Sequence, residues 1–140
     1  MKQLFGLILV LFSAVTLADS PASNPTDELA QYLFAPELVL KYRQDIGLDA
    51  AQSKALKEVI QKAQARFLDL QWDMQAETGK LATLLKARPV DSAAALAQVD
   101  RVLTQERDVK KAQLALLIGI KNLLSDAQQD QLVELRRKGF

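Results

Sequence analysis

Two long stretches of the sequence, residues 50–87 and 92–122, place apolar residues at steps of three and four and contain no proline. In the first stretch the apolar row is Leu56, Val59, Ala63, Phe67, Leu70, Met74, Leu81 and Leu84/Leu85. In the second stretch it is Leu96, Val99, Val102/Leu103, Val109, Leu116/Leu117, Ile120 and Leu123. This spacing predicts two long helices, each with one apolar face. No segment alternates with period two over the length of a strand, so the expected fold class is all-α.

The residues between the two stretches predict a tight turn. Arg88-Pro89 ends the first long helix, because the residue before a proline is disfavoured in the α region. Asp91 is suited to cap the second. A connection of about four residues makes the two helices neighbours in an antiparallel hairpin.

Short helices are expected on both sides of the hairpin. One covers residues 36–45, with Pro36 in its first turn and Gly47 just after its end. The other covers residues 126–137 and ends before Gly139. The expected architecture therefore has four helices: an elongated antiparallel helical hairpin with short flanking helices.

The N-terminus has the layout of a secretory signal peptide. Lys2 precedes the apolar residues 4–12, and Thr16-Leu17-Ala18 places small residues before a cleavage site after Ala18. A membrane anchor is the alternative, but the apolar run is shorter than the roughly 20 residues that span a bilayer. We therefore expect residues 1–18 to be a signal peptide and the protein to reside in the periplasm.

The remaining chain divides into two parts by composition. Residues 19–33 begin with turn-forming residues and are expected to be a flexible leader, although Thr26–Leu33 can add one or two helical turns. Residues 34–140 are expected to form the helical domain.

Composition excludes several kinds of chemistry. The chain has no cysteine and no histidine, which rules out disulfides, Cys/His zinc sites and Ser-His-Asp or Cys-His catalysis. Its 18 Lys and Arg residues balance 17 Asp and Glu residues, which argues against a nucleic-acid partner. Asp69 and Asp73 are one helical turn apart, but exposed helical carboxylates are routine. We therefore expect neither an enzyme nor a cofactor.

Two short segments repeat the same helix-start pattern. Leu48-Asp49-Ala50-Ala51-Gln52 and Leu124-Ser125-Asp126-Ala127-Gln128 each have a leucine, an N-cap residue and a glutamine three residues after the cap. This is the spacing of a capping box, in which the cap side chain and the glutamine side chain each bond the other's backbone N–H. Two ordinary helix starts are a sufficient explanation of the pattern. The residues of these capping motifs are Leu48, Asp49, Gln52, Leu124, Ser125 and Gln128.

The order of these elements resembles the periplasmic LTxxQ-motif family, which includes Spy and CpxP and has the CnrX-type heavy-metal sensors as relatives. The resemblance covers residues 34–138; Ser125 and Asp49 replace the threonine of the motif. It implies an elongated, bent helical hairpin that forms a homodimer. Spy-like members hold unfolded periplasmic proteins without ATP, CpxP-like members also damp a membrane-bound sensor kinase, and CnrX-like members bind metal through His, Met and carboxylate groups.

This chain departs from the metal-binding members. It has no histidine, and Met74, the one methionine after residue 18, falls on an apolar helix face where a core position is the better interpretation. No metal ligand is therefore assigned. The expected function is ATP-independent binding of partially unfolded proteins in the envelope stress response. The alternative is a signalling component, either a sensor-kinase inhibitor or a heavy-metal resistance or sensor protein, which requires a membrane-bound partner.

Trp72 lies opposite the apolar row of its helix, and Ala65 and Leu68 lie near it. These three residues are candidate contacts for a client protein or a second subunit. In the alternative interpretation Tyr32, Phe34 or Tyr42 packs on Trp72. Glu106 and Gln113 fall close to the apolar side of the second long helix, where they can mark a polar layer.

Overall fold

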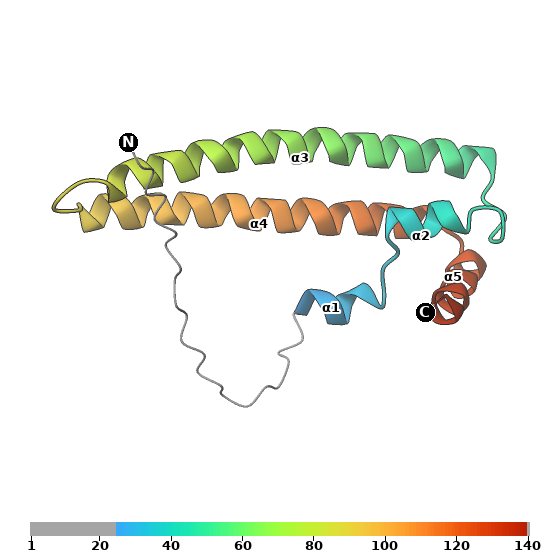
Figure 1. Ribbon diagram of the computed structural model, residues 1–140. Helices are drawn as coiled ribbons and strands as arrows, with labels where there is room; N and C mark the ends of the chain where they lie inside the picture. The colour runs from blue at the N-terminus through green and yellow to red at the C-terminus, as the bar shows by residue number, and fades with distance from the viewer. Residues whose placement is uncertain (1–24, 140) are drawn as a thin grey trace, which may run out of the picture.

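The computed structural model describes residues 25–139, with side chains described from residue 28 onward. In this part of the chain there are five helices and no strand (Figure 1). They are α1 (Pro25–Ala30), α2 (Pro36–Lys41), α3 (Ala50–Leu85), α4 (Ser92–Leu123) and α5 (Asp126–Lys138). The predicted all-α fold is confirmed. The predicted signal peptide, residues 1–18, and its cleavage site after Ala18 lie outside the described residues.

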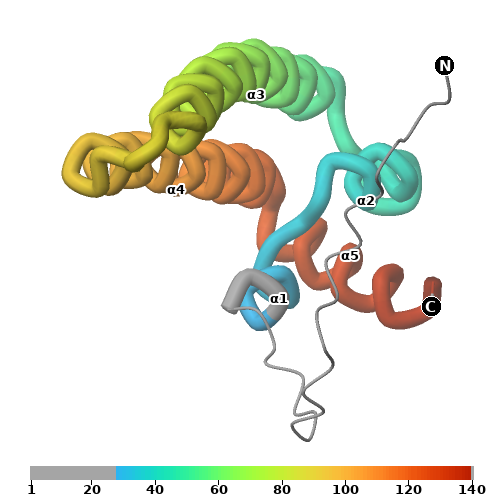
Figure 2. Tube along the Cα trace, turned by 60° about the vertical axis from the view of Figure 1, so that its left-hand side comes forward, coloured from blue at the N-terminus to red at the C-terminus, as the bar shows by residue number. Residues whose placement is uncertain are grey.

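Helices α3 and α4 form the expected antiparallel hairpin and run side by side over their length (Figures 1 and 2). At 36 residues, α3 is about 54 Å long. Asp91 is the N-cap of α4, and its Oδ1 accepts a hydrogen bond of 3.0 Å from the backbone N–H of Ala94. The three short helices lie toward the end of the hairpin opposite the 86–91 turn (Figure 1).

The contact between α3 and α4 is a heptad seam. Buried or half-buried residues recur every seven positions on both helices, as in a coiled coil. On α3 they are Leu56, Ala63, Leu70, Glu77 and Leu84. On α4 they are Ala95, Val102, Val109, Leu116 and Leu123, with Gln98, Gln105, Ala112 and Gly119 between them.

One layer of the seam is polar. Gln98 donates through Nε2 to the backbone oxygen of Glu77 at 2.9 Å and to its Oε2 at 2.6 Å. Lys80 Nζ lies 2.8 Å from Glu77 Oε1. The hydrogen bonds from Lys80 and Gln98 hold the pKa of Glu77 below its ordinary value. This layer fixes the register of the two helices, because sliding one helix would leave Gln98 buried without its partner.

The main hydrophobic core lies where α2 and α5 meet the ends of α3 and α4. We call it the base core, and its buried residues are Phe34, Val39, Ile46, Leu56, Ile120, Leu124 and Leu132. Each fully buried aliphatic side chain contributes about 1.5–3 kcal/mol to stability. The short helices are therefore held to the hairpin by this cluster.

The structure differs from the sequence-based expectation in its short N-terminal elements. There are five helices in residues 25–139 instead of four, because α1 lies within the segment expected to be flexible. Helix α2 ends at Lys41, and turns follow up to Gly47. Gly47 has φ +64°, a value that favours glycine.

Part of the expected row of α4 lies outside the seam. Leu96 and Leu103 were expected in the buried row but are 65% and 52% exposed. Near the turn the seam is formed by Ala95, Gln98 and Val102 instead. Toward the other end the helices approach closely, because a Cβ at Gly119 would lie 3.3 Å from Val59 Cγ1.

Candidate functional site

Both sequence-predicted capping motifs form complete capping boxes. Asp49 Oδ1 accepts from the backbone N–H of Gln52 at 2.7 Å, and Gln52 Oε1 accepts from the backbone N–H of Asp49 at 3.2 Å. Ser125 Oγ accepts from the backbone N–H of Gln128 at 3.2 Å, and Gln128 Oε1 accepts from that of Ser125 at 2.9 Å. Each box satisfies two backbone donors at the start of a helix.

The two boxes are joined to each other through their glutamines. Gln52 Nε2 donates to Gln128 Oε1 at 2.7 Å, and Gln128 Nε2 donates to Gln52 Oε1 at 3.0 Å. The repeated glutamine therefore closes a reciprocal amide pair between positions 76 residues apart. Sequence reasoning identified each box but missed this pairing, because neither spacing nor composition shows which helix starts meet in space.

The amide pair also binds the surrounding backbone. Gln52 Nε2 donates to the oxygen of Leu123 at 2.9 Å, at the end of α4. Gln128 Nε2 donates to the oxygens of Ile46 and Gly47 at 3.3 and 3.4 Å, in the loop before α3. The two glutamines thus hold together the starts of α3 and α5, the end of α4 and the loop before α3. We call this arrangement the glutamine clamp.

The leucines of the two motifs contribute to packing. Leu124 is buried in the base core, and Leu48 is half-buried and packs against it. Each motif therefore combines a hydrophobic contact with a helix cap. The described geometry of these motifs is structural, since it positions helices and leaves no reactive group directed toward a cleft.

Two cations, missed by sequence reasoning, hold the loop that follows α1. Arg136 donates from its guanidinium to the oxygens of Ala30, Gln31 and Leu33 at 3.2, 2.7 and 2.9 Å. Lys121 Nζ donates to the oxygen of Tyr32 at 2.9 Å. Four successive carbonyl oxygens are thus bound from α4 and α5, so residues 30–33 are anchored within the segment expected to be flexible.

The candidate contact residues Ala65, Leu68 and Trp72 lie together on one exposed face of α3. Leu68 is 55% exposed and Trp72 is 66% exposed, and Ala65 is also exposed. Leu70, two residues before Trp72, is buried in the seam. Two helical residues turn the direction by about 200°, so the three residues point away from α4. We call this surface the Trp72 face.

None of the aromatic residues proposed as a cover takes Trp72 out of solvent. Phe34 is buried in the base core and Tyr42 packs against that core, while Tyr32 is itself exposed. The Trp72 face is therefore open within the described part of the chain.

A second exposed apolar row lies on α4. Leu96 and Leu103 are seven residues apart, so they lie on one line along the helix. Both residues are exposed. We call this pair the Leu103 row. Sequence reasoning assigned both residues to the buried row because of their spacing, which does not show how closely the two helices approach.

The expected polar layer differs in its residues. Glu106 and Gln113 are exposed beside the seam, whereas Gln98 and Gln105 lie within it. The Oε1 atom of Gln105 is buried and has no hydrogen-bond partner among the described residues. The two polar seam positions on α4, Gln98 and Gln105, are one heptad apart, and the side chain of Gln98 has hydrogen-bond partners.

The described residues do not form a metal-binding cluster. No group of three or more Asp, Glu, His or Cys residues comes together in residues 25–139. Asp69 and Asp73 are both exposed on α3, and Met74 is half-buried on the side of that helix facing α4. In the same part of the chain, no helix is both long and apolar enough to cross a membrane.

The described residues thus form a small all-α protein, a helical hairpin held at one end by two joined capping boxes. The chain belongs to the heavy-metal resistance family, whose sequence model matches residues 4–131. This match confirms the resemblance to the LTxxQ and CnrX-type proteins. No curated protein and no solved structure matches the chain.

Because the family is described as one of heavy-metal resistance, the side-chain donors of this chain can be compared with those that heavy-metal ions prefer. Soft and borderline transition metals prefer thiolate, thioether and imidazole ligands. The chain has no cysteine and no histidine, and the thioether of Met74 belongs to a half-buried residue without a second donor cluster beside it. The donor set of the described residues therefore does not fit such an ion, and no step of the function below depends on one.

Proposed function

We propose that the protein binds partially unfolded proteins in the periplasm without ATP and releases them without chemistry. The observation that carries this proposal is the openness of the Trp72 face. A tryptophan that is 66% exposed beside a leucine that is 55% exposed is unusual for a surface with no partner, because aromatic anchors of this kind are enriched at binding sites.

The size of the Trp72 face suits weak, reversible binding. Covering Trp72 and Leu68 removes on the order of 200 Å² of apolar surface from water, which is about 5 kcal/mol at 25 cal/mol per Å². Association costs about 4 kcal/mol or more in lost motional freedom. The apolar contact alone therefore leaves little net affinity, and a client segment must also contact other exposed groups, such as the Leu103 row on α4.

The proposal includes a homodimer, no enzymatic activity and no cofactor. A second copy would bring two Trp72 faces or two Leu103 rows into one assembly, so that a client is held at several weak sites at once. Such multivalency raises avidity without new contact chemistry. Location in the periplasm rests on the signal-peptide pattern of residues 1–18.

The test measures aggregation of two unrelated, chemically denatured client proteins by light scattering. The purified protein at a few-fold molar excess is expected to suppress aggregation of both. The two single variants Trp72→Ser and Leu68→Ser are each expected to lose most of this protection, because each change removes apolar surface from the Trp72 face.

Leu85→Ser is the matched control, since Leu85 is on the same helix and is 55% exposed like Leu68 but lies outside the Trp72 face. It should protect clients as well as the parent does. The proposal is wrong if neither client is protected, or if Leu85→Ser loses as much protection as Leu68→Ser.

A second candidate is a signalling component of heavy-metal resistance, and the family membership favours it. In that role the hairpin would bind a membrane-bound sensor instead of unfolded clients. Titration with nickel, cobalt, zinc and copper, followed by calorimetry, tests its metal-binding form. Micromolar binding together with absent client protection would select this candidate over the first.

A further inference from the structure

A partly open cavity lies between α1 and the hairpin, apart from the residues of the Trp72 face. It has a volume of about 480 Å³ and is bounded by three helices. Helix α1 contributes Leu29 and Ala30, α3 contributes Phe67, and α4 contributes five residues. This volume lies within the range of about 300–1,000 Å³ that is typical of small-molecule sites. The lining residues are Leu29, Ala30, Leu33, Phe67, Lys110, Gln113, Leu114, Leu116 and Leu117.

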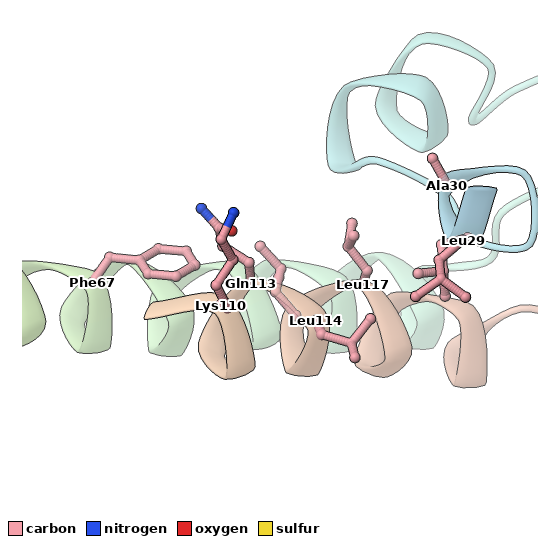
Figure 3. Close-up of a pocket in the computed structure, with 9 residues that line it drawn as sticks. Leu29, Ala30, Phe67, Lys110, Gln113, Leu114 and Leu117 are labelled. Atoms are coloured by element: carbon pink, nitrogen blue, oxygen red, sulfur yellow. The ribbon is translucent and has the colours of Figure 1, made fainter. Parts of the chain in front are cut away.

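The cavity is amphipathic along its length. Seven of its nine lining residues are apolar, and the polar two, Lys110 and Gln113, are one turn apart on α4. Figure 3 shows their nitrogen atoms together near Phe67, whereas Leu29 and Ala30 of α1 lie at the other end beyond Leu117. From Lys110 to Leu117 the wall extends about 10 Å along α4.

The polar end carries one unpaired positive charge. No carboxylate lines the cavity. Within the part of the chain that the structure describes, Lys110 makes no ion pair, and neither Lys110 nor Gln113 makes a hydrogen bond through its side chain. An ammonium group and an amide N–H are both donors, so this end is complementary to an anionic acceptor.

Hydrogen bonds, in addition to the packing of α1, hold the apolar end of the cavity in place. Arg136 binds the oxygens of Ala30 and Leu33, which are both lining residues, and Lys121 binds the oxygen of Tyr32 between them. These bonds keep α1 over α4. The cavity is therefore preformed, which lowers the entropic cost of binding a ligand.

We propose that this cavity binds a single-chain amphiphile with an anionic head group, specifically a free fatty acid. The alkyl chain lies along Leu117, Leu114 and Leu29, and the carboxylate meets Lys110 and Gln113. This site is separate from the Trp72 face and does not rest on the chaperone proposal.

The binding test uses dodecanoate as the probe, titrated into the purified protein by calorimetry below the concentration at which the probe forms micelles. Saturable binding is expected. Dodecanol and dodecyltrimethylammonium carry the same alkyl chain with a neutral or positive head, and both should bind at least about fivefold more weakly. Butanoate, which keeps the carboxylate but loses most of the chain, should not bind measurably.

Two variants locate the ligand. Lys110→Glu should weaken dodecanoate binding about tenfold or more. Lys111→Glu is its matched control, because it makes the same change of charge on the adjacent exposed residue, which does not line the cavity; its affinity should equal that of the parent. Ala30→Trp fills the apolar end and should abolish binding, while circular dichroism shows an unchanged helix content.

Several results would overturn this proposal. The first is that dodecanoate does not bind saturably, and the second is that dodecyltrimethylammonium binds as tightly as dodecanoate. The third is that Lys110→Glu and Lys111→Glu weaken dodecanoate binding equally, and the fourth is that Ala30→Trp binds dodecanoate as the parent does. The proposal is also contradicted if the protein sediments with phosphatidylglycerol vesicles but does not bind free dodecanoate, since the ligand would then be a membrane surface. Trp72→Ser should bind dodecanoate normally even where it loses client protection, so each proposal can fail without the other.

Discussion

The glutamine clamp makes a quantitative prediction about energetic coupling between two distant positions. Gln52 and Gln128 exchange two hydrogen bonds, of 2.7 and 3.0 Å. A hydrogen bond contributes about 1 kcal/mol net to stability. The reciprocal pair should therefore give a coupling energy of about 2 kcal/mol between Gln52→Ala and Gln128→Ala.

Each single variant should cost more than this coupling. Gln52→Ala also loses the bonds to the backbone of Leu123 and Asp49. Gln128→Ala also loses the bond from Ser125 and the one to Ile46 and Gly47, whose two oxygens share a single amide hydrogen. Two further bonds at about 1 kcal/mol each bring the expected loss to about 4 kcal/mol for either variant. The double variant loses the shared pair only once, so its expected loss is about 6 kcal/mol and not 8 kcal/mol.

The assay is urea unfolding followed by far-ultraviolet circular dichroism, at one protein concentration so that any association affects all variants equally. Gln61→Ala and Gln131→Ala form the matched control cycle, because both residues are exposed glutamines on α3 and α5. Their effects should be small and additive. If the losses of Gln52→Ala and Gln128→Ala also add to within about 0.5 kcal/mol, the two boxes act independently and the clamp reasoning is refuted.

Three further predictions concern the seam. The pKa of Glu77 is lowered in the folded chain by Lys80 and Gln98, so its contribution is present above its ordinary value of 4.5 and is lost as the pH falls through the lowered value. The difference in free energy of unfolding between the parent and Glu77→Gln should therefore become smaller as the pH falls. Urea titrations at several pH values measure it, and a difference that grows in acid contradicts this prediction. Gln105→Leu should raise the free energy of unfolding by about 1 kcal/mol, because it removes a buried Oε1 without a partner among the described residues; a lower thermal midpoint would show that this oxygen is satisfied. Gly119→Leu should destabilise by about 1–3 kcal/mol through its contact with Val59, whereas Gly79→Ala, with nothing within 4 Å of the new Cβ, should stabilise by about 1 kcal/mol; equal effects in thermal unfolding would contradict the close approach.

The sequence predicted the parts of the fold that depend on local patterns. Asp49, Asp91 and Ser125 cap helices that begin where the sequence predicted. A cap can be predicted locally because its side chain accepts a hydrogen bond from a backbone N–H only two or three residues away. The hairpin followed from the absence of proline in two periodic stretches and its presence at Pro89.

The parts that were wrong or missed depend on how closely distant elements approach. Leu96 and Leu103 were assigned to the buried row by their spacing, yet Ala95, Gln98 and Gln105 lie in the seam. Helix spacing decides which of two adjacent rows is buried, and it depends on both partners at once. The helical turns of α1 were allowed for in the sequence, but their anchoring was missed for the same reason, because Arg136 lies more than 100 residues away.

The candidate surfaces also differ in whether local patterns predict them. Helical geometry alone predicts that Trp72 and Leu70 point to opposite sides of α3. The cavity beside Lys110 could not, because it exists only where α1 returns to the hairpin.

The placement of the base core at one end of the hairpin has a consequence for motion. Of the described helices, only α3 and α4 reach the 86–91 turn, and Leu85, Val90 and Leu96 are exposed there (Figure 1). Local opening costs least where few apolar contacts are lost, so opening at the turn end costs less free energy than opening at the base core. The ends of α3 and α4 beside the turn can fray and re-form while α2 and α5 stay folded. Residues 86–91 still join the two helices, and the Glu77–Gln98 layer is the first hydrogen-bonded contact between them that such fraying meets.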